Sequence, residues 1–140
     1  MINESGRILS VDPGTKRTGL AVSDELGITA QGLETFVAGK DMKLVAHIAD
    51  LVEKYGIIRV VLGMPLSMSG GEIEGTERSR ALAAEIEAEC GVEVVLRDER
   101  MTSLEVERVM KQEGRIKDPG DIDRLSAVVL LQSYLEETGS

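Results

Sequence analysis

Residues 7–24, RILSVDPGTKRTGLAVSD, contain two apolar runs separated by a Gly-containing connection. Such a pattern is typical of a β-hairpin. A hairpin needs only a turn, yet this one carries Asp12 where the first strand is expected to end, followed by Lys16 and Arg17. An aspartate with two cations beside it points to a role in binding or chemistry.

A structural alternative exists for the same residues. Asp-Pro-Gly is an ordinary turn sequence, because Pro13 presets the backbone of the turn and Gly14 relaxes it. Taken alone, Asp12 is therefore better explained by a turn than by a site. The rest of the chain has to decide between the two interpretations.

Beyond the hairpin, the hydrophobic patterns predict alternating strands and helices. The order β-β-β-α-β-α-β-α-α favours an α/β fold, with a mixed five-stranded sheet flanked by helices. At 140 residues the chain fits one domain, residues 1–140. We expect strands at 7–11, 18–23, about 31–37, 58–63 and 93–97, and helices at 41–55, about 75–90, 102–112 and about 121–137.

Composition excludes several classes of protein and of metal site. Hydrophobic residues make up 42% and charged residues 29% of the chain, the profile of a soluble globular protein. No apolar run reaches 18 residues and no charged-then-apolar leader is present, so we expect a cytoplasmic protein. The single Cys90 and the single His47 exclude an internal disulfide, multi-cysteine zinc sites and histidine-based triads. A metal would need oxygen ligands, which favours Mg²⁺ or Mn²⁺.

The net charge of −9 argues against a nucleic-acid partner at first sight. Net charge hides a distribution, however, and many of the 16 cations fall within or next to the candidate motifs. Overall acidity lowers non-specific binding without forbidding a local basic site.

Carboxylates follow the ends of several predicted strands. Asp12 ends the first strand, Glu99 follows the fifth, and Asp123 lies near the start of the last helix. Ligands in open α/β sheets collect beyond the carboxyl ends of strands. Each carboxylate also has a plain interpretation, since residues 98–100 could form a solvated strand exit and Asp121 or Asp123 could cap a helix.

The joint pattern is more specific than its parts. Asp123 shares one mostly apolar helix face with Ala127, Leu130 and Tyr134, where a carboxylate is costly unless a cation meets it. Carboxylates crowded together repel one another unless metal ions neutralise them. Such a cluster suits two-metal phosphodiester chemistry, in which two Mg²⁺ ions about 4 Å apart activate water and stabilise the leaving oxygen. We expect Lys16, Arg17 and Arg100 to hold phosphate oxygens.

Four motifs in order carry a resemblance over nearly the whole chain: DPGTKRTGLAVSD, VVLGMPLSMSGG, VEVVLRDERMTS and DRLSAVVLLQSYL. The chain resembles the YqgF/RuvX family, RNase H-like proteins described as Holliday junction resolvases and as nucleases of ribosomal RNA precursors. The resemblance implies an RNase H-like fold and a Mg²⁺ site. Its catalytic, metal-binding carboxylates map onto Asp12, Glu99 and Asp123. DRLSA fits the family's Asp-x-x-Ala-Ala pattern with Ser126 in place of an alanine, which favours Asp123 over Asp118 or Asp121.

The resemblance also sets the expected function and its alternatives. It implies a metal-dependent endonuclease acting on structured RNA or branched DNA, and leaves open which of the two, as well as a monomer or a homodimer. A non-catalytic RNA-binding or ribosome-assembly factor with the same fold is the first alternative. The second is a sugar-kinase-like ATP site, because DPGTKRTG also resembles that superfamily's phosphate loop; those proteins need two such domains. A pI near 4.7 argues against tight binding to long duplexes.

Overall fold

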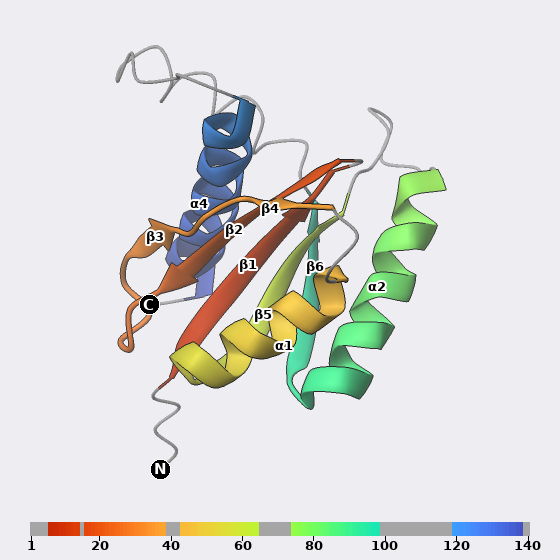
Figure 1. Cartoon of the computed structure of the whole chain (residues 1–140). Coiled ribbons are helices and arrows are strands. Elements are labelled where there is room, and N and C mark those ends of the chain that lie inside the picture. Colours follow the sequence, from red (N-terminus) through yellow and green to blue (C-terminus); the bar gives the residue numbers. More distant parts are fainter. Residues whose placement is uncertain (1–5, 15, 39–42, 65–73, 99–118, 139–140) are drawn as a thin grey trace.

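A computed structural model describes residues 6–14, 16–38, 43–64, 74–98 and 119–138. These form a mixed sheet with helices on both faces (Figure 1). The strands are β1 (Arg7–Pro13), β2 (Arg17–Ser23), β3 (Ala30–Gly32), β4 (Phe36–Val37), β5 (Ile57–Met64) and β6 (Glu93–Asp98). The helices are α1 (Leu44–Tyr55), α2 (Glu74–Cys90) and α4 (Pro119–Thr138).

The strand order is β3-β2-β1-β5-β6, with β4 also paired to β2. β1 and β2 are antiparallel, whereas β1, β5 and β6 run parallel. The parallel strands therefore end at one edge of the sheet, which Pro13, Met64 and Asp98 mark. We call this the carboxyl edge. A hairpin followed by parallel crossovers is the predicted topology, and it is confirmed.

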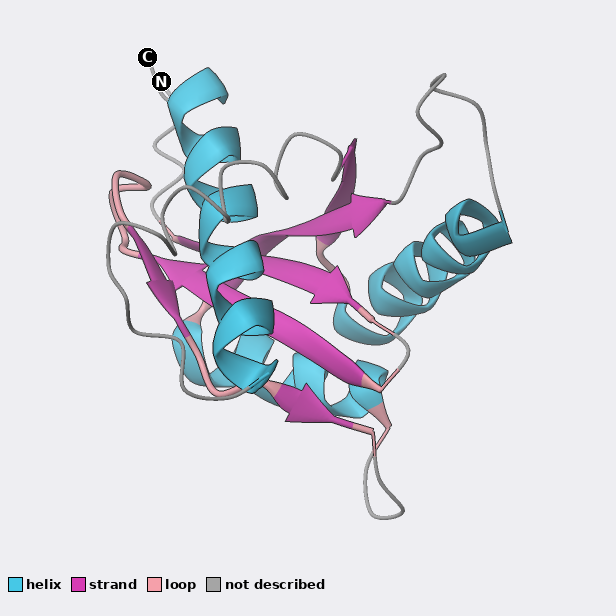
Figure 2. Cartoon of the chain, turned by 90° about the horizontal axis from the view of Figure 1, so that it is seen from above, coloured by secondary structure: helices cyan, strands magenta, loops and turns pink. Residues whose placement is uncertain are grey.

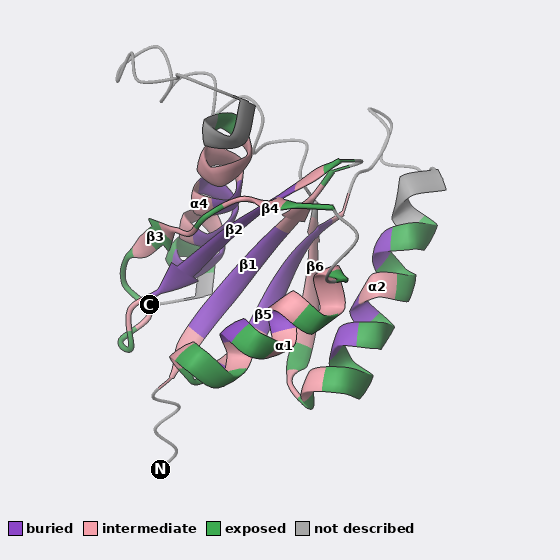
Figure 3. Cartoon of the chain, viewed as in Figure 1, coloured by how far each residue is buried: buried purple, intermediate pink, exposed green. Residues whose placement is uncertain are grey.

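Two apolar layers hold the helices on the sheet. Alternate residues of β1 point to opposite faces, so Leu9 and Val11 pack under α1 and α2, while Ile8 packs under α4. Viewed from above, α4 covers one face and α1 with α2 the other (Figure 2). The central strands are buried along most of their length (Figure 3). Full burial of one such aliphatic side chain contributes roughly 1.5–3 kcal/mol, so both layers matter for stability.

The strand that pairs with β2 on the outer side of the sheet differs from the prediction. The single strand expected at about 31–37 is two short strands, β3 and β4. Ala21 pairs with Gly32 but Thr18 pairs with Phe36, so this side carries one residue more than β2 between those pairs. In between, the Leu33 carbonyl accepts a 3.0 Å hydrogen bond from Arg124 Nε of α4. The local pattern could not reveal that a helix far along the chain contacts this carbonyl.

Other element boundaries agree closely with the prediction. Gly91 ends α2 as expected, with a positive φ of 68° and its N–H donating to the Glu87 carbonyl. Cys90 packs against the core, as its spacing predicts, and burial raises the pKa of its thiol. The helix predicted over 102–112 lies outside the described residues.

Candidate active site at the carboxyl edge

Asp12 belongs to a strand and not to a turn. β1 continues through Pro13, and Asp12 pairs with Gly19 of β2 inside the ladder. The turn interpretation of Asp12 is therefore wrong, because pairing with β2 carries β1 two residues past its apolar run. The alternation of β1 places Asp12 on the same face as Ile8 and Ser10, which is the face that α4 covers.

Small residues bring α4 close to this face. A Cβ atom on Gly19 would lie 1.9 Å from the backbone oxygen of Asp123, so only glycine fits at this position. One turn further along α4, the buried Ser10 hydroxyl donates a 2.7 Å hydrogen bond to the Ala127 carbonyl. These contacts fix the N-terminal half of α4 over β1 and β2, and with it the side chain of Asp123.

Asp123 lies inside α4, which begins at Pro119, so it is not the helix cap. Ala127, Leu130 and Tyr134, which were predicted to share its face, are buried against the sheet. The Asp123 side chain is 24% exposed, and its Oδ2 accepts a 2.7 Å hydrogen bond from Arg17 Nε at the start of β2. The cation expected beside this carboxylate is therefore an arginine from the hairpin.

The electrostatics of Asp12 follow from this packing. The pKa of Asp12 is raised to about 7, chiefly by burial and also by the negative charge of Asp123, while a hydrogen bond from Ser126 acts in the opposite direction. Ser126 is the residue that stands where the family pattern has alanine. Two carboxylates thus share a poorly solvated place, and one of them resists ionisation near neutral pH.

This donor set fits a divalent cation. Carboxylate oxygens are preferred ligands of Mg²⁺ and Mn²⁺, and a bound cation would offset both the burial and the mutual repulsion of Asp12 and Asp123. No cluster of three or more metal-ligating side chains occurs among the residues that the structure describes. Within those residues, Asp12 and Asp123 offer the carboxylate oxygens that such a cation would need.

The structure describes some of the other predicted site residues and not others. Lys16 is described and exposed, next to Arg17. β6 reaches Asp98, the residue before Glu99. Glu99, Arg100 and Asp118 lie outside the described residues, as does the side chain of Asp121. Their predicted roles stay predictions.

Two contributors to the site were not predicted from sequence. Gly19 has no side chain to suggest a role, although a glycine within a strand pattern is a sign of close backbone approach. Ser126 was noted only as a departure from the family pattern. Its contact with Asp12 requires α4 to lie on β1, which no local sequence pattern shows.

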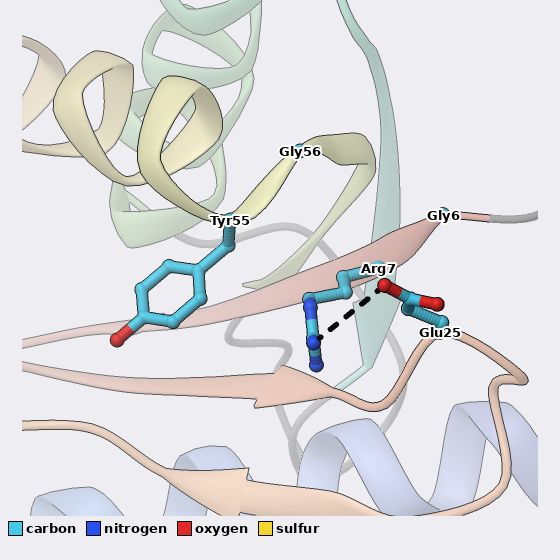
Figure 4. A pocket seen from close by; sticks show the side chains of 5 residues that line it. All are labelled: Gly6, Arg7, Glu25, Tyr55 and Gly56. Carbon is cyan, nitrogen blue, oxygen red and sulfur yellow. Dashed lines mark ion pairs between the residues drawn. The ribbon is translucent and has the colours of Figure 1, made fainter.

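A hollow lies at the opposite edge of the sheet, where β1 and β5 begin (Figure 4). It has a volume of about 240 Å³ and is lined by Gly6, Arg7, Glu25, Tyr55 and Gly56. Its one carboxylate, Glu25, pairs with Arg7 at 3.9 Å and is largely exposed. This hollow lacks the crowded carboxylates of the carboxyl edge, so we do not assign the chemistry to it.

None of the helices within the described ranges is both long and apolar enough to cross a membrane.

Comparison with known proteins identifies relatives along nearly the whole chain. The family model of RuvX, described as Holliday junction resolvase, matches residues 6–137. A protein of Koribacter versatilis named "Putative pre-16S rRNA nuclease" is 46% identical over 136 residues, covering 96% of this chain and 89% of its own. A protein of the same name from Pelotomaculum thermopropionicum is 39% identical over 136 residues, covering 95% and 88%.

Solved structures support the fold. Thermus thermophilus RuvC in complex with a Holliday junction superposes with a TM-score of 0.58 at 15% identity, covering 95% of this chain and 96% of that one. The fowlpox virus Holliday junction resolvase gives a TM-score of 0.58 at 16% identity, covering 94% and 99%. At such identities the likeness shows the fold alone, which is RNase H-like as predicted. On the family match and the sequence relatives, the chain belongs to the RuvX family of nucleases, hydrolases that act on the ester bonds of nucleic acids.

Proposed function

We propose that the chain is a Mg²⁺- or Mn²⁺-dependent endonuclease that hydrolyses phosphodiester bonds of structured nucleic acid, with Asp12, Glu99 and Asp123 as metal ligands and catalytic residues. The observation that carries the proposal is the position of Asp12, partly buried on the sheet face that α4 covers and near Asp123, which together raise the pKa of Asp12 to about 7. A folded protein bears the cost of two crowded carboxylates when a bound cation offsets it.

Each residue has a part in this proposal. Asp12 and Asp123 supply carboxylate oxygens from a strand and a helix whose relative position the Gly19 contact fixes. When bound, two metal ions would supply Lewis-acid activation of water and charge stabilisation at the leaving oxygen. Lys16 is exposed next to this edge, where its ammonium can meet a phosphate oxygen. Arg17 and Arg100 are the other proposed phosphate contacts.

A precursor of ribosomal RNA is the first substrate to test, and branched DNA the second. The relatives named for the precursor of 16S rRNA are up to 46% identical to this chain, whereas the resolvases of known structure are about 15% identical. Both substrates are structured nucleic acids, and the same carboxylates would serve either. A cytoplasmic location would suit both.

The experiment is a cleavage panel in Mg²⁺ with precursor RNA, a four-way junction, a linear duplex and single strands. Asp12→Asn is the active-site variant. Glu25→Gln, which removes one carboxylate from an arginine pair at the opposite edge, is the matched control. We expect cleavage of a structured substrate by wild type and by the control, and none by Asp12→Asn.

The alternative of a non-catalytic RNA-binding or assembly factor makes a different prediction. Such a protein would bind RNA with equal affinity whether or not Asp12 is present, and would leave every substrate intact in Mg²⁺ and in Mn²⁺. That result, with binding measured on the same samples, would reject the nuclease proposal.

A further inference from the structure

The contact between Arg17 and Asp123 joins residues 106 positions apart in the chain. Arg17 Nε lies 2.7 Å from Oδ2 of Asp123, and their side chains are 40% and 24% exposed. The contact bridges the start of β2 and the first half of α4. The Arg17 side chain therefore links the β1–β2 hairpin to the Asp123 carboxylate of α4.

The described arginine–carboxylate pairs are not alike. In the pairs Arg7–Glu25, Arg59–Glu93 and Arg97–Glu137, the carboxylate side chain is 59–74% exposed. Such exposed pairs contribute little, because solvent screens them and both side chains stay mobile. The carboxylate of Asp123 is the least exposed of these four, and its charge also acts on the partly buried Asp12.

That second carboxylate is the reason Asp123 needs a partner. Asp12 lies on the face of β1 that α4 covers, and its side chain is hydrogen-bonded to Ser126, three residues after Asp123, so the two carboxylates repel each other when both are ionised. Repulsion alone would drive the Asp123 side chain to a rotamer that points away. A hydrogen bond from the planar guanidinium to one oxygen fixes the carboxylate group and leaves its other oxygen available.

We propose that Arg17 is a positioning residue, which holds the carboxylate of Asp123 beside Asp12 in the orientation that metal binding requires. This inference rests on the proposed function. It differs from a role for Arg17 in phosphate binding alone, because it makes Arg17 act before any nucleic acid is present. Partners that orient metal ligands in this way typically affect metal affinity or activity by roughly 10- to 100-fold when they are removed.

The test is a Mg²⁺ titration of thermal stability without substrate, since an ion that binds only the folded state raises the melting temperature. We expect Arg17→Gln to raise the Mg²⁺ concentration at the midpoint of this response about 10-fold. Arg17→Lys keeps the charge but not the Nε geometry, so it should restore only part of the affinity. Melting in chelator and circular dichroism show whether each variant is folded.

Two controls separate position from charge. Lys16→Gln removes a neighbouring positive charge, and Arg59→Gln removes an arginine from an exposed ion pair far from the carboxyl edge. Both should keep the wild-type Mg²⁺ midpoint within about twofold, because the cation that pairs with Asp123 is still present in each. In cleavage assays at saturating Mg²⁺, Lys16→Gln should mainly raise KM, whereas Arg17→Gln should lower kcat because Asp123 is displaced.

The outcomes are distinguishable. If wild type responds to Mg²⁺ but Arg17→Gln has the same or a lower midpoint, Arg17 does not position Asp123, while the metal site stands. Raised midpoints in both Arg17 variants support the proposal, whether or not Arg17→Lys does better than Arg17→Gln. If wild type shows no Mg²⁺ response, the proposed metal-dependent function fails and the positioning role fails with it.

Discussion

The two edges of the sheet both carry an arginine–carboxylate pair, yet they differ in kind. At the carboxyl edge, Arg17 meets Asp123 at 2.7 Å, and a second, partly buried carboxyl group, that of Asp12, lies within reach of the charge of Asp123. At the opposite edge, Arg7 meets Glu25 at 3.9 Å, and the Glu25 side chain is 74% exposed. One edge brings two partly buried carboxyl groups together. The other pairs an arginine with a carboxylate that is largely exposed to solvent.

This difference in the burial and crowding of carboxyl groups distinguishes the candidate site from an ordinary surface ion pair. Opposite charges on a surface are compensated by water whether or not they meet. Two partly buried carboxyl groups that lie near each other destabilise the folded protein when both are ionised. Substitutions at the two edges should therefore have very different consequences for cleavage, for stability and for the response to Mg²⁺.

Cleavage should be the most sensitive property of the carboxyl edge. Asp12→Asn, Asp123→Asn and Glu99→Gln should each reduce cleavage by about a thousandfold or more, because each removes a ligand of one cluster. A double variant, Asp12→Asn with Asp123→Asn, should be little worse than either single variant, as for residues that act as a unit. Single-turnover rates in Mg²⁺ measure this. Multiplying losses in the double variant would show that the two carboxylates act independently.

Packing at the carboxyl edge should be the next most sensitive property. Gly19→Ala should destabilise the protein by about 3 kcal/mol or more, because the new Cβ would overlap the Asp123 backbone. Gly27→Ala, in the turn at the opposite edge, should cost only about 1–2 kcal/mol, the strain of its positive φ of 72°. Denaturant unfolding measures both. Equal losses would mean that α4 does not approach β2 closely at Gly19.

The third effect is a pH dependence. A carboxyl whose folded pKa exceeds its unfolded value of 3.8 binds more protons when folded, so stability falls as pH rises between about 4 and 7. In chelator, Asp12→Asn should lack this fall and exceed wild type at pH 8 by about 2 kcal/mol, less than the full shift implies because Asp12 keeps some solvent contact. Near pH 4 the two should match. Mg²⁺ should reduce the difference at pH 8, and a constant difference across pH would contradict the raised pKa.

Glu25 at the opposite edge should matter least. Glu25→Gln removes the carboxylate of an exposed pair, so the free energy of unfolding should change by about 0.5 kcal/mol or less. Neither Mg²⁺ response nor cleavage should change. A Mg²⁺ response that is lost in Glu25→Gln would place the cation at the opposite edge of the sheet and contradict the assignment of the metal site to the carboxyl edge.

Much of the fold could be predicted from the sequence because its signals are local. The apolar runs of β1, β2, β5 and β6, and the helical spacing of α1, α2 and α4, are each readable over a few residues. The division of the strand beside β2 into β3 and β4 was missed; between them, the Leu33 carbonyl accepts a hydrogen bond from Arg124 of α4. Long-range contacts of single side chains leave no periodic pattern.

The candidate site could likewise be predicted only in part from the sequence. From the sequence alone it follows that any metal needs oxygen ligands, since one histidine and one cysteine are too few for a histidine- or thiolate-ligated site, and the motifs singled out Asp12 and Asp123. Tertiary structure decided that Asp12 is a strand residue facing α4, that Gly19 lets the helix approach, and that Arg17 holds Asp123. The physical reason is that the type of a side chain determines which chemistry it can perform. Its burial, its repulsion by other charges and its ion pairs depend instead on distances between segments that only the packed chain brings together.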